Sequence, residues 1–215
     1  MARDFLEVSP WLNGGPEPST VRDAVFRADR LKTMRMRLSA AYKGVNALLM
    51  NEGALDWRSG QSFNDTVFFD ENVDIHHIFP KDWCTRQGIK ADRYDSIINK
   101  TPLAYRTNRI IGGFAPTAYL GKLEAGGANT PPIVPGDLDS YLRTHLINPD
   151  LLRADDFESF MRDRQERLLA MIEGTMGKSA HRETAKLPDD PEPVVEEGDD
   201  ENDALEAELT MEAAE

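Results

Sequence analysis

An abrupt change in charge after Lys186 limits how much of this chain can fold. Residues 187–215 hold 13 acidic residues and no basic residue, whereas residues 1–186 hold 25 of each. High net charge with few bulky apolar side chains is typical of disordered segments, so we expect an acidic disordered tail over residues 187–215. The net charge of −13 belongs to that tail. The part expected to fold is neutral, and its charge does not exclude a nucleic-acid partner.

The remaining composition is typical of one soluble domain. A hydrophobic content of 40% is enough for a core. No apolar run is long enough for a membrane span, and the N-terminus carries no apolar signal segment, so we expect a cytoplasmic protein with no membrane partner. The single cysteine, Cys84, excludes an internal disulfide and a multi-cysteine zinc site. We expect a packed thiol there, and any metal must be held by His, Asp and Asn.

The N-terminal third is predicted to be largely helical. Residues 1–20 are rich in Pro and Gly and are expected to form an irregular lead-in. Residues 21–70 form a helical part, because apolar residues recur at steps of three and four over residues 21–51, as in one long helix or two in series. This segment is also basic, and its Arg35 and Lys43 could contact phosphates. A solvated helix face is an equal alternative.

The rest of the chain mixes strand and helix patterns. β-branched and aromatic residues predict a strand over residues 67–69 or 73–79, and a second one over residues 101–105. Helices are predicted over residues 91–98, from Pro116 onward, and over residues 138–146 and 154–176. The last helix places six apolar residues on or near one face: Phe157, Phe160, Met161, Leu168, Leu169 and Ile172. These elements indicate an α+β fold.

A cluster of polar residues in the first predicted strand could carry chemistry. Asp74, His76 and His77 precede two asparagines, Asn99 and Asn108, that are nine residues apart. Strand alternation points Asp74 and His76 to one face and His77 to the other, so the histidines flank one site only if the strand twists or ends there. One histidine, with Asp74 nearby, could then bind a cation. The other could act as a general base near neutral pH.

Two asparagines could divide the supporting roles in such a site. One amide oxygen can accept a hydrogen bond from an imidazole Nδ1, which leaves Nε2 to take a proton. Another is a hard oxygen ligand suited to magnesium or manganese. Basic residues in the same stretch could hold the backbone of a nucleic acid. They are Lys81, Arg86, Lys90, Arg93, Lys100, Arg106 and Arg109.

Each of these residues also has a structural interpretation. Adjacent histidines on a strand are most often one buried and one solvated residue with no joint role. An asparagine before a strand is usually a turn residue, and Asn108 could be only a helix cap. The arrangement as a whole is a stronger signal than its separate members.

The arrangement resembles the HNH endonucleases, also called ββα-metal nucleases, over residues 73–120. The segment DIHHIFP is similar to the family's strand motif Asp-x-Asp-His-Ile-x-Pro, with His76 in place of the second Asp. The resemblance implies that His76 and Asn108 bind a metal, that His77 is the general base, and that Asn99 orients it.

The family also implies an architecture and a cofactor. It implies a β-hairpin and helix core, residues 71–125, set between helical parts over residues 21–70 and 126–186. Asp74 matches a family residue that lies close to the metal, as a ligand or just behind one. The colicin type has a further histidine at the position of Gly112, so the resemblance implies one Mg²⁺, with Mn²⁺ possible and Zn²⁺ less favoured.

A wider similarity extends to the flanking segments. Residues 37–60 and 99–120 resemble the C-terminal nuclease half of GmrSD-type modification-dependent restriction proteins. In those proteins a ParB-like nucleotide-hydrolysing domain comes first, so a domain or subunit of that kind is an expected partner.

The predicted function is metal-dependent hydrolysis of DNA phosphodiester bonds in a restriction or anti-phage defence system. The DNA, which could be modified, would be held by basic residues: Lys81, Lys100, Arg106, Arg109, Arg35 and Lys43. The alternatives are a catalytically inactive DNA-binding module and a regulatory interaction subunit.

Overall fold

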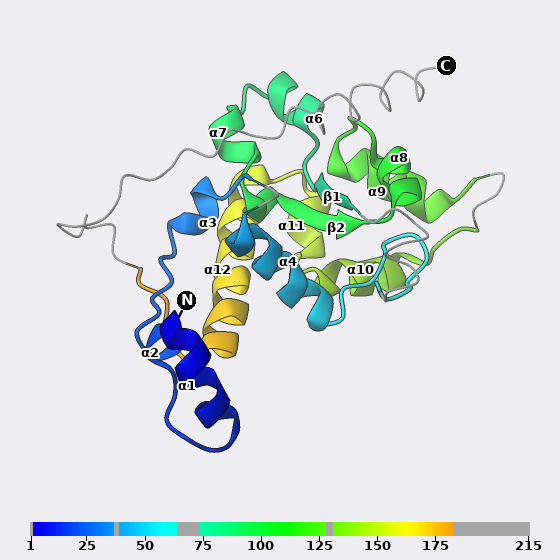
Figure 1. Cartoon of the computed structure of the whole chain (residues 1–215). Coiled ribbons are helices and arrows are strands. Elements are labelled where there is room, and N and C mark those ends of the chain that lie inside the picture. Colours follow the sequence, from blue (N-terminus) through cyan, green and yellow to red (C-terminus); the bar gives the residue numbers. More distant parts are fainter. Residues whose placement is uncertain (1, 37–38, 64–73, 128–130, 183–215) are drawn as a thin grey trace.

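A single small sheet lies among helices in the computed structural model, which describes residues 2–36, 39–63, 74–127 and 131–182 (Figure 1). The two strands, β1 (Asp74–His77) and β2 (Lys100–Leu103), are antiparallel, and the other elements are helical. The α+β prediction is therefore confirmed. The expected acidic tail and the alternative strand over residues 67–69 lie outside the described residues. None of the helices in the described ranges is long and apolar enough to cross a membrane.

The N-terminal residues are helical, and the expectation of an irregular lead-in was wrong for them. Helix α1 (Ala2–Leu12) contains Pro10, and α2 (Ser19–Arg22) follows after a turn. Pro10 lies in the last turn of α1, where the missing N–H removes only one helical hydrogen bond. Glu7 ties the two helices together by accepting bonds from the N–H and Oγ of Ser19 at 2.7 and 2.9 Å.

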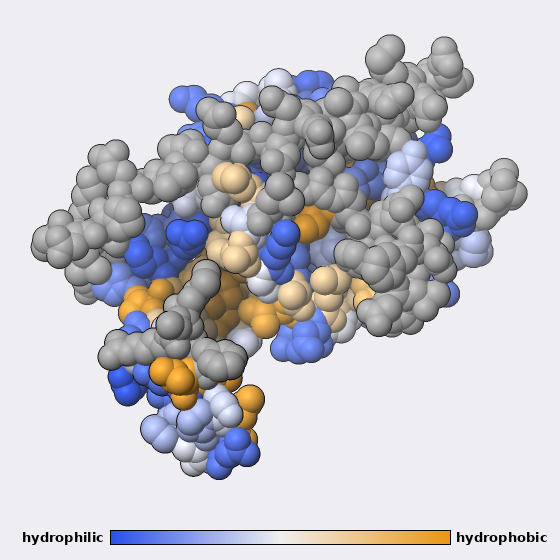
Figure 2. All heavy atoms as spheres, viewed as in Figure 1, coloured by the Kyte–Doolittle hydropathy of each residue, from blue (hydrophilic) through white to orange (hydrophobic). Residues whose placement is uncertain are grey.

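Helix α1 projects away from the rest of the molecule (Figure 1). Two of its leucines, Leu6 and Leu12, are largely exposed, and orange apolar atoms are visible on this projecting part in Figure 2. Isolated exposed leucines are normal on protein surfaces, so these two residues alone do not define a site.

The helical pattern of residues 21–51 is broken twice by backbone pairing. Among the described residues between 23 and 51, only α3 (Arg30–Thr33) and α4 (Ala40–Asn51) are helical. Ala28 N donates to His181 O at 2.9 Å, and Ile97 N donates to Met34 O at 2.9 Å. These long-range bonds hold the segments on either side of α3 extended. They explain why one continuous helix does not form over residues 21–51, whereas two separate helices, α3 and α4, follow each other there.

The connection between the strands carries three short helical turns. They are α6 (Lys81–Arg86), α7 (Ala91–Tyr94) and the 3₁₀ turn η1 (Ile97–Asn99). The register pairs Asp74 with Leu103, Ile75 with Pro102, His76 with Thr101 and His77 with Lys100. Helix α8 (Tyr105–Ile111) follows β2 directly, and α9 (Pro116–Ala125) begins at the predicted proline.

Three helices complete the fold and supply much of its core. They are α10 (Pro135–Thr144), α11 (Pro149–Arg153) and α12 (Phe157–Met176). The predicted start at residue 154 is three residues early, because Asp156 caps α12 by accepting from Ser159 N at 3.0 Å.

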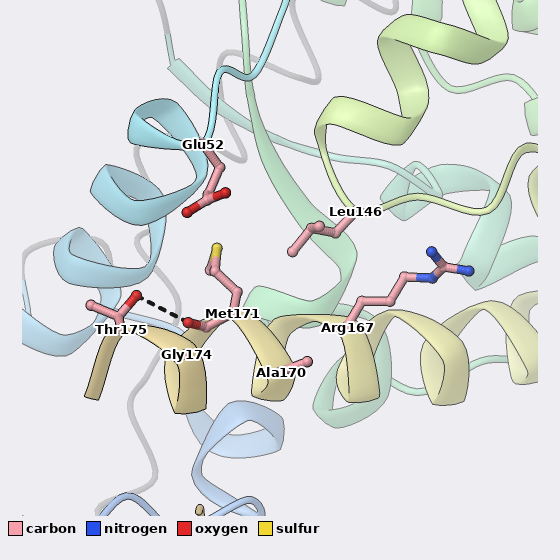
Figure 3. A pocket seen from close by; sticks show the side chains of 7 residues that line it. All are labelled: Glu52, Leu146, Arg167, Ala170, Met171, Gly174 and Thr175. Carbon is pink, nitrogen blue, oxygen red and sulfur yellow. Dashed lines mark hydrogen bonds between the residues drawn. The ribbon is translucent and has the colours of Figure 1, made fainter. Parts of the chain in front are cut away.

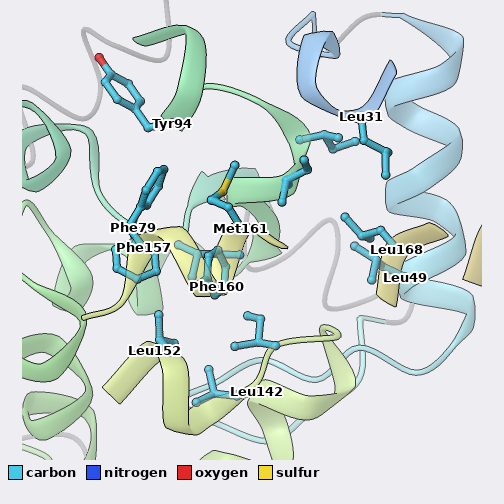
Figure 4. Packing of buried hydrophobic residues seen from close by; sticks show 14 of the residues in the cluster. Leu31, Leu49, Phe79, Tyr94, Leu142, Leu152, Phe157, Phe160, Met161 and Leu168 are labelled. Atoms are coloured by element: carbon cyan, nitrogen blue, oxygen red, sulfur yellow. The ribbon is translucent and has the colours of Figure 1, made fainter. Parts of the chain in front are cut away.

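All six apolar residues predicted for one face of α12 are buried. Figure 4 shows four of them in one cluster with residues from α4, α10 and the loop after β1. The helical parts on both sides of the sheet therefore share one hydrophobic core.

Candidate functional site

His77 ends β1 and faces a carboxylate. Its Nε2 lies 3.1 Å from Oδ1 of Asp95, the residue that follows α7. Lys100, the register partner of His77 on β2, places its Nζ 2.6 Å from the same oxygen. The Tyr94 ring packs edge-on against the imidazole, with centroids 5.9 Å apart. Both His77 and Lys100 are buried, so the three polar side chains form a compact internal cluster.

The charges and hydrogen bonds of this cluster determine which of its groups carry protons. Burial acts to raise the pKa of Asp95, but the hydrogen bonds and positive charges of His77 and Lys100 outweigh it and lower that pKa to about 2. Asp95 is therefore an ionised acceptor at neutral pH. Because a carboxylate can only accept, the His77 nitrogen that faces it, Nε2, must carry the proton.

This geometry changes the roles expected for the ring nitrogens. The prediction was that Asn99 would hold Nδ1 and leave Nε2 to act as the base. Instead Asp95 holds Nε2, and the proton-accepting position of a neutral His77 is Nδ1. Asp95 was missed because nothing in its local sequence distinguishes it from other acidic residues. Only the fold brings it to His77.

Asn99 has a different task from the predicted one. Its Oδ1 accepts from Phe79 N, and its Nδ2 donates to the carbonyl oxygens of Phe79 and Tyr94, each at 2.9 Å. The side chain is fully buried. Asn99 therefore joins the residues after β1 to the end of α7. It orients His77 only through the backbone.

Two of the predicted metal ligands, His76 and Asn108, are buried polar residues. His76 is 5% exposed and pairs with Thr101, and Asn108 is 7% exposed in the middle of α8. No side-chain hydrogen bond joins the Asn108 amide to another described residue. The backbone of Asp74 pairs with Leu103, but its side chain lies outside the described part of the structure. Within that part, no group of three or more His, Cys, Asp or Glu side chains is placed so that it could hold a metal ion.

The expected DNA-binding residues divide into two kinds. Lys100 is buried in its ion pair with Asp95, so the expectation that it contacts phosphates does not fit its environment. Arg35 donates to the carbonyl oxygen of Asp92 at 3.1 Å. The others lie at the surface to differing degrees: Lys81 is half-buried, and Lys43, Arg106 and Arg109 are exposed.

A buried arginine supports the segment that carries Asn99. Arg164 of α12 is fully buried and donates to the carbonyl oxygens of Ile98, Lys100 (2.8 Å) and His145 (3.3 Å). Burial lowers the pKa of Arg164 to about 9. No carboxylate pairs with it among the residues that can be described. Its position on the apolar face of α12 was the one sequence signal that could have identified it.

Two further buried polar residues hold β2 and the start of α8. His145 Nδ1 lies 2.7 Å from Thr101 Oγ1, and its Nε2 lies 2.7 Å from the carbonyl oxygen of Leu55. Asp56 accepts a hydrogen bond from Oγ1 of Thr107 at 2.7 Å. Thr107 is the residue before Asn108. Both His145 and Asp56 lie far from the motif in sequence, so pattern analysis did not connect them with it.

Cys84 is the packed thiol that its sequence context predicted. It is fully buried, and burial raises its pKa to about 12, so it stays protonated at neutral pH. A nucleophilic role would need the thiolate.

A surface hollow lies elsewhere, between α4, α12 and the turn after α10 (Figure 3). Its volume is about 540 Å³, and Glu52, Leu146, Arg167 and Met171 are among the lining residues. None of the residues predicted for the site lines it. We therefore do not associate it with the chemistry around His77.

Comparisons with known proteins leave the family open. No protein-family model matches the chain, and no solved structure matches it significantly. A curated protein of Methanocaldococcus jannaschii, described as uncharacterized protein MJ0686, is 32% identical over 125 residues, or 56% of this chain. The chain spans about a fifth, 21%, of the length of that relative. The similarity links this chain to part of a much longer protein whose activity its description does not give.

Proposed function

We propose that this chain is a metal-dependent endonuclease of the HNH type that hydrolyses phosphodiester bonds in DNA. The observation that supports this most is the His77–Asp95 pair at the end of β1, in a hairpin whose second strand leads directly into the helix carrying Asn108. A histidine with its far nitrogen held by a carboxylate is suited to general-base catalysis. The strand, strand and helix order agrees with the family resemblance.

In this proposal His77 takes the proton from the attacking water. Asp95 keeps the proton on Nε2, so the proton from water goes to Nδ1. The imidazolium that forms is stabilised by the nearby negative charge of Asp95. Lys100 shares that carboxylate, so Asp95 faces two basic groups at once.

The residues available for a cation fit magnesium better than zinc. His76 and Asn108 offer one imidazole nitrogen and one amide oxygen, and Asp74 is a candidate for a carboxylate oxygen. A hard cation that keeps several water ligands can be held by such a small set. When bound, Mg²⁺ would neutralise charge that develops on the phosphate. Mn²⁺ is the alternative ion, and Zn²⁺ is less favoured.

The cellular role is also part of the proposal. The similarity of residues 37–60 and 99–120 to GmrSD-type proteins favours a cytoplasmic restriction or anti-phage defence system, with DNA that could be modified. The relative from M. jannaschii is long enough to hold further domains. A ParB-like nucleotide-hydrolysing domain or subunit is the partner we propose.

Plasmid nicking tests the proposal directly. We expect supercoiled plasmid, plain or modified, to be nicked with Mg²⁺ or Mn²⁺ and not with EDTA. His77→Ala should lower the rate about a hundredfold or more while leaving DNA binding intact. His181→Ala, outside the site, is the matched control. Equal nicking by His77→Ala and the native chain would refute the assignment, and binding without any nicking would favour the inactive DNA-binding alternative.

A further inference from the structure

The turn between α8 and α9 presents an aromatic ring at the surface. Phe114 follows Gly112 and Gly113 and is 37% exposed. Gly112 has a φ of 48°, in the left-handed region that favours glycine. The N–H of Gly112 donates to Asn108 O at 3.0 Å. This bond attaches the loop that carries Phe114 to the end of α8, near the proposed metal ligand Asn108.

The ring is held in place on two sides. Lys122 of α9 lies over its face, with Nζ 3.1 Å from the ring centroid. On another side the ring packs against Gly112, where an added Cβ would lie 3.4 Å from Cδ2 and Cε2 of Phe114. Arg86 of α6 fixes the turn by donating to Gly113 O at 2.5 Å. A partner that contacts this ring would meet an already ordered side chain.

The surroundings of the ring carry positive charge. Residues 96–123 contain four basic residues and no acidic residue. Arg106, Arg109 and Lys122 are exposed on α8 and α9, and the Arg109 guanidinium lies 5.9 Å from the centroid of the Tyr105 ring. Asp82 is an acidic neighbour of the turn, beside Gly113. Cations interleaved with aromatic rings are the combination that binds single-stranded nucleic acid, through phosphates and base stacking.

We propose that Phe114 is a base-stacking residue and that this chain binds DNA preferentially where a base is unpaired. The faces of bases are covered by their neighbours in an intact duplex and become available where the strand is single or distorted. Arg106, Arg109 and Lys122 would contact the phosphates of that strand. The inference rests on the proposed function only in taking DNA as the partner.

Binding measured in EDTA separates this inference from catalysis. Fluorescence anisotropy would compare a single-stranded oligodeoxynucleotide, the same oligonucleotide with abasic positions, and its duplex. Loss of one base–aromatic stack corresponds to a weakening of about tenfold. We therefore expect Phe114→Ala to bind the intact single strand about tenfold less tightly, and Phe114→Trp to bind it normally. Phe114→Ala and the native chain should bind the abasic strand equally well.

Trp11→Ala supplies the matched control, because Trp11 is an aromatic residue of similar exposure, 39%, on α1. Lys122→Met should reduce the slope of log affinity against log salt by about 0.7, the value for one phosphate contact on a single strand. Equal binding of the intact strand by Phe114→Ala and the native chain would overturn the inference, as would an equal loss on the abasic strand. His77→Ala should bind like the native chain, so a failure of nicking and a failure of stacking give different results.

Discussion

Asn99 and Phe79 are joined by two hydrogen bonds that run in opposite directions between one side chain and one backbone unit. The amide oxygen of Asn99 accepts from Phe79 N, and its amide nitrogen donates to Phe79 O. This pair fixes the chain just after His77. Asn99 therefore has a structural role that does not depend on catalysis at His77.

Replacing Asn99 should therefore destabilise the fold. In Asn99→Ala three buried backbone groups each lose a hydrogen bond, so we expect the free energy of unfolding to fall by roughly 3 kcal/mol or more. Asn148→Ala is a matched control, because Asn148 caps α11 at a partly exposed position and its loss should cost only about 1 kcal/mol. Urea unfolding measures both. Equal losses would show that the buried amide of Asn99 contributes no more than a cap.

The Asp95 cluster allows stability and activity to be separated. Asp95→Asn leaves the buried Lys100 ammonium without its carboxylate, and should lower the free energy of unfolding by roughly 3–5 kcal/mol. Adding Lys100→Met removes that charge and should restore much of the stability. Nicking should stay slow in the double variant, because the neutral amide at position 95 can both donate and accept and carries no negative charge, so it neither fixes the proton on His77 Nε2 nor stabilises a charged imidazolium. A double variant with native stability and native nicking would show that Asp95 only balances Lys100.

Arg164 should be one of the most sensitive positions in α12. Arg164→Met removes the donors to the carbonyl groups of Ile98 and Lys100, and we expect a loss of roughly 3 kcal/mol or more in unfolding free energy. Arg167→Met, one turn along, removes a partly exposed pair with Asp163 and should cost less than about 1 kcal/mol. Thermal unfolding compares the two. A larger loss of stability in Arg167→Met would contradict the role of Arg164 in holding the carbonyl groups of Ile98 and Lys100.

His145 should make the fold sensitive to mild acid. Burial lowers its pKa to about 4, from an ordinary value of 6.5. As pH falls from 6.5 towards 4, His145 therefore takes up a proton in the unfolded chain but not in the folded chain. The free energy of unfolding is highest above pH 6.5 and decreases over this range. We expect a loss of roughly 2 kcal/mol by about pH 5.

Urea unfolding at several pH values tests this dependence. His145→Gln cannot titrate but can still donate to Leu55 O, so its stability should change less between about pH 7 and pH 5 than that of the native chain. The same pH dependence in both proteins would place the acid sensitivity elsewhere.

Asn108→Ala tests the cation site. If the Asn108 amide oxygen binds the ion, its loss should weaken cleavage at low Mg²⁺ or Mn²⁺, and higher concentrations should partly restore the rate. Nicking measured over a series of metal concentrations gives the apparent affinity. A loss of rate that no metal concentration reverses, with an altered circular dichroism spectrum, would point to a folding defect.

Elements with strong local signals were predicted well from the sequence. Strand β1 lies within the predicted range 73–79, and α9 begins at Pro116 as predicted, because the fixed φ and missing N–H of proline act within a few residues. The apolar stripe of α12 was correct because helical periodicity depends only on spacing.

Elements and roles that depend on distant partners were not predictable. The chain is extended at Ala28 because of His181, and at Met34 because of Ile97. In the same way Asp95 and Arg164 gain their roles from contacts with His77 and with the carbonyl groups around Asn99. A single sequence shows which residue types are available for a site. It does not show which of them meet.

The position of Arg164 in the chain also has a consequence for biosynthesis. The residues proposed to bind the cation or to take part in hydrolysis have all been synthesised by Asn108, but the arginine that satisfies the carbonyl groups beside Asn99 comes only with α12. The ribosome must therefore add more than 50 further residues before β2 can reach its final environment. An incomplete nascent chain would carry every candidate catalytic group and still lack the arginine that supports the segment around Asn99, so the local structure proposed to be catalytic forms only after α12 has been made.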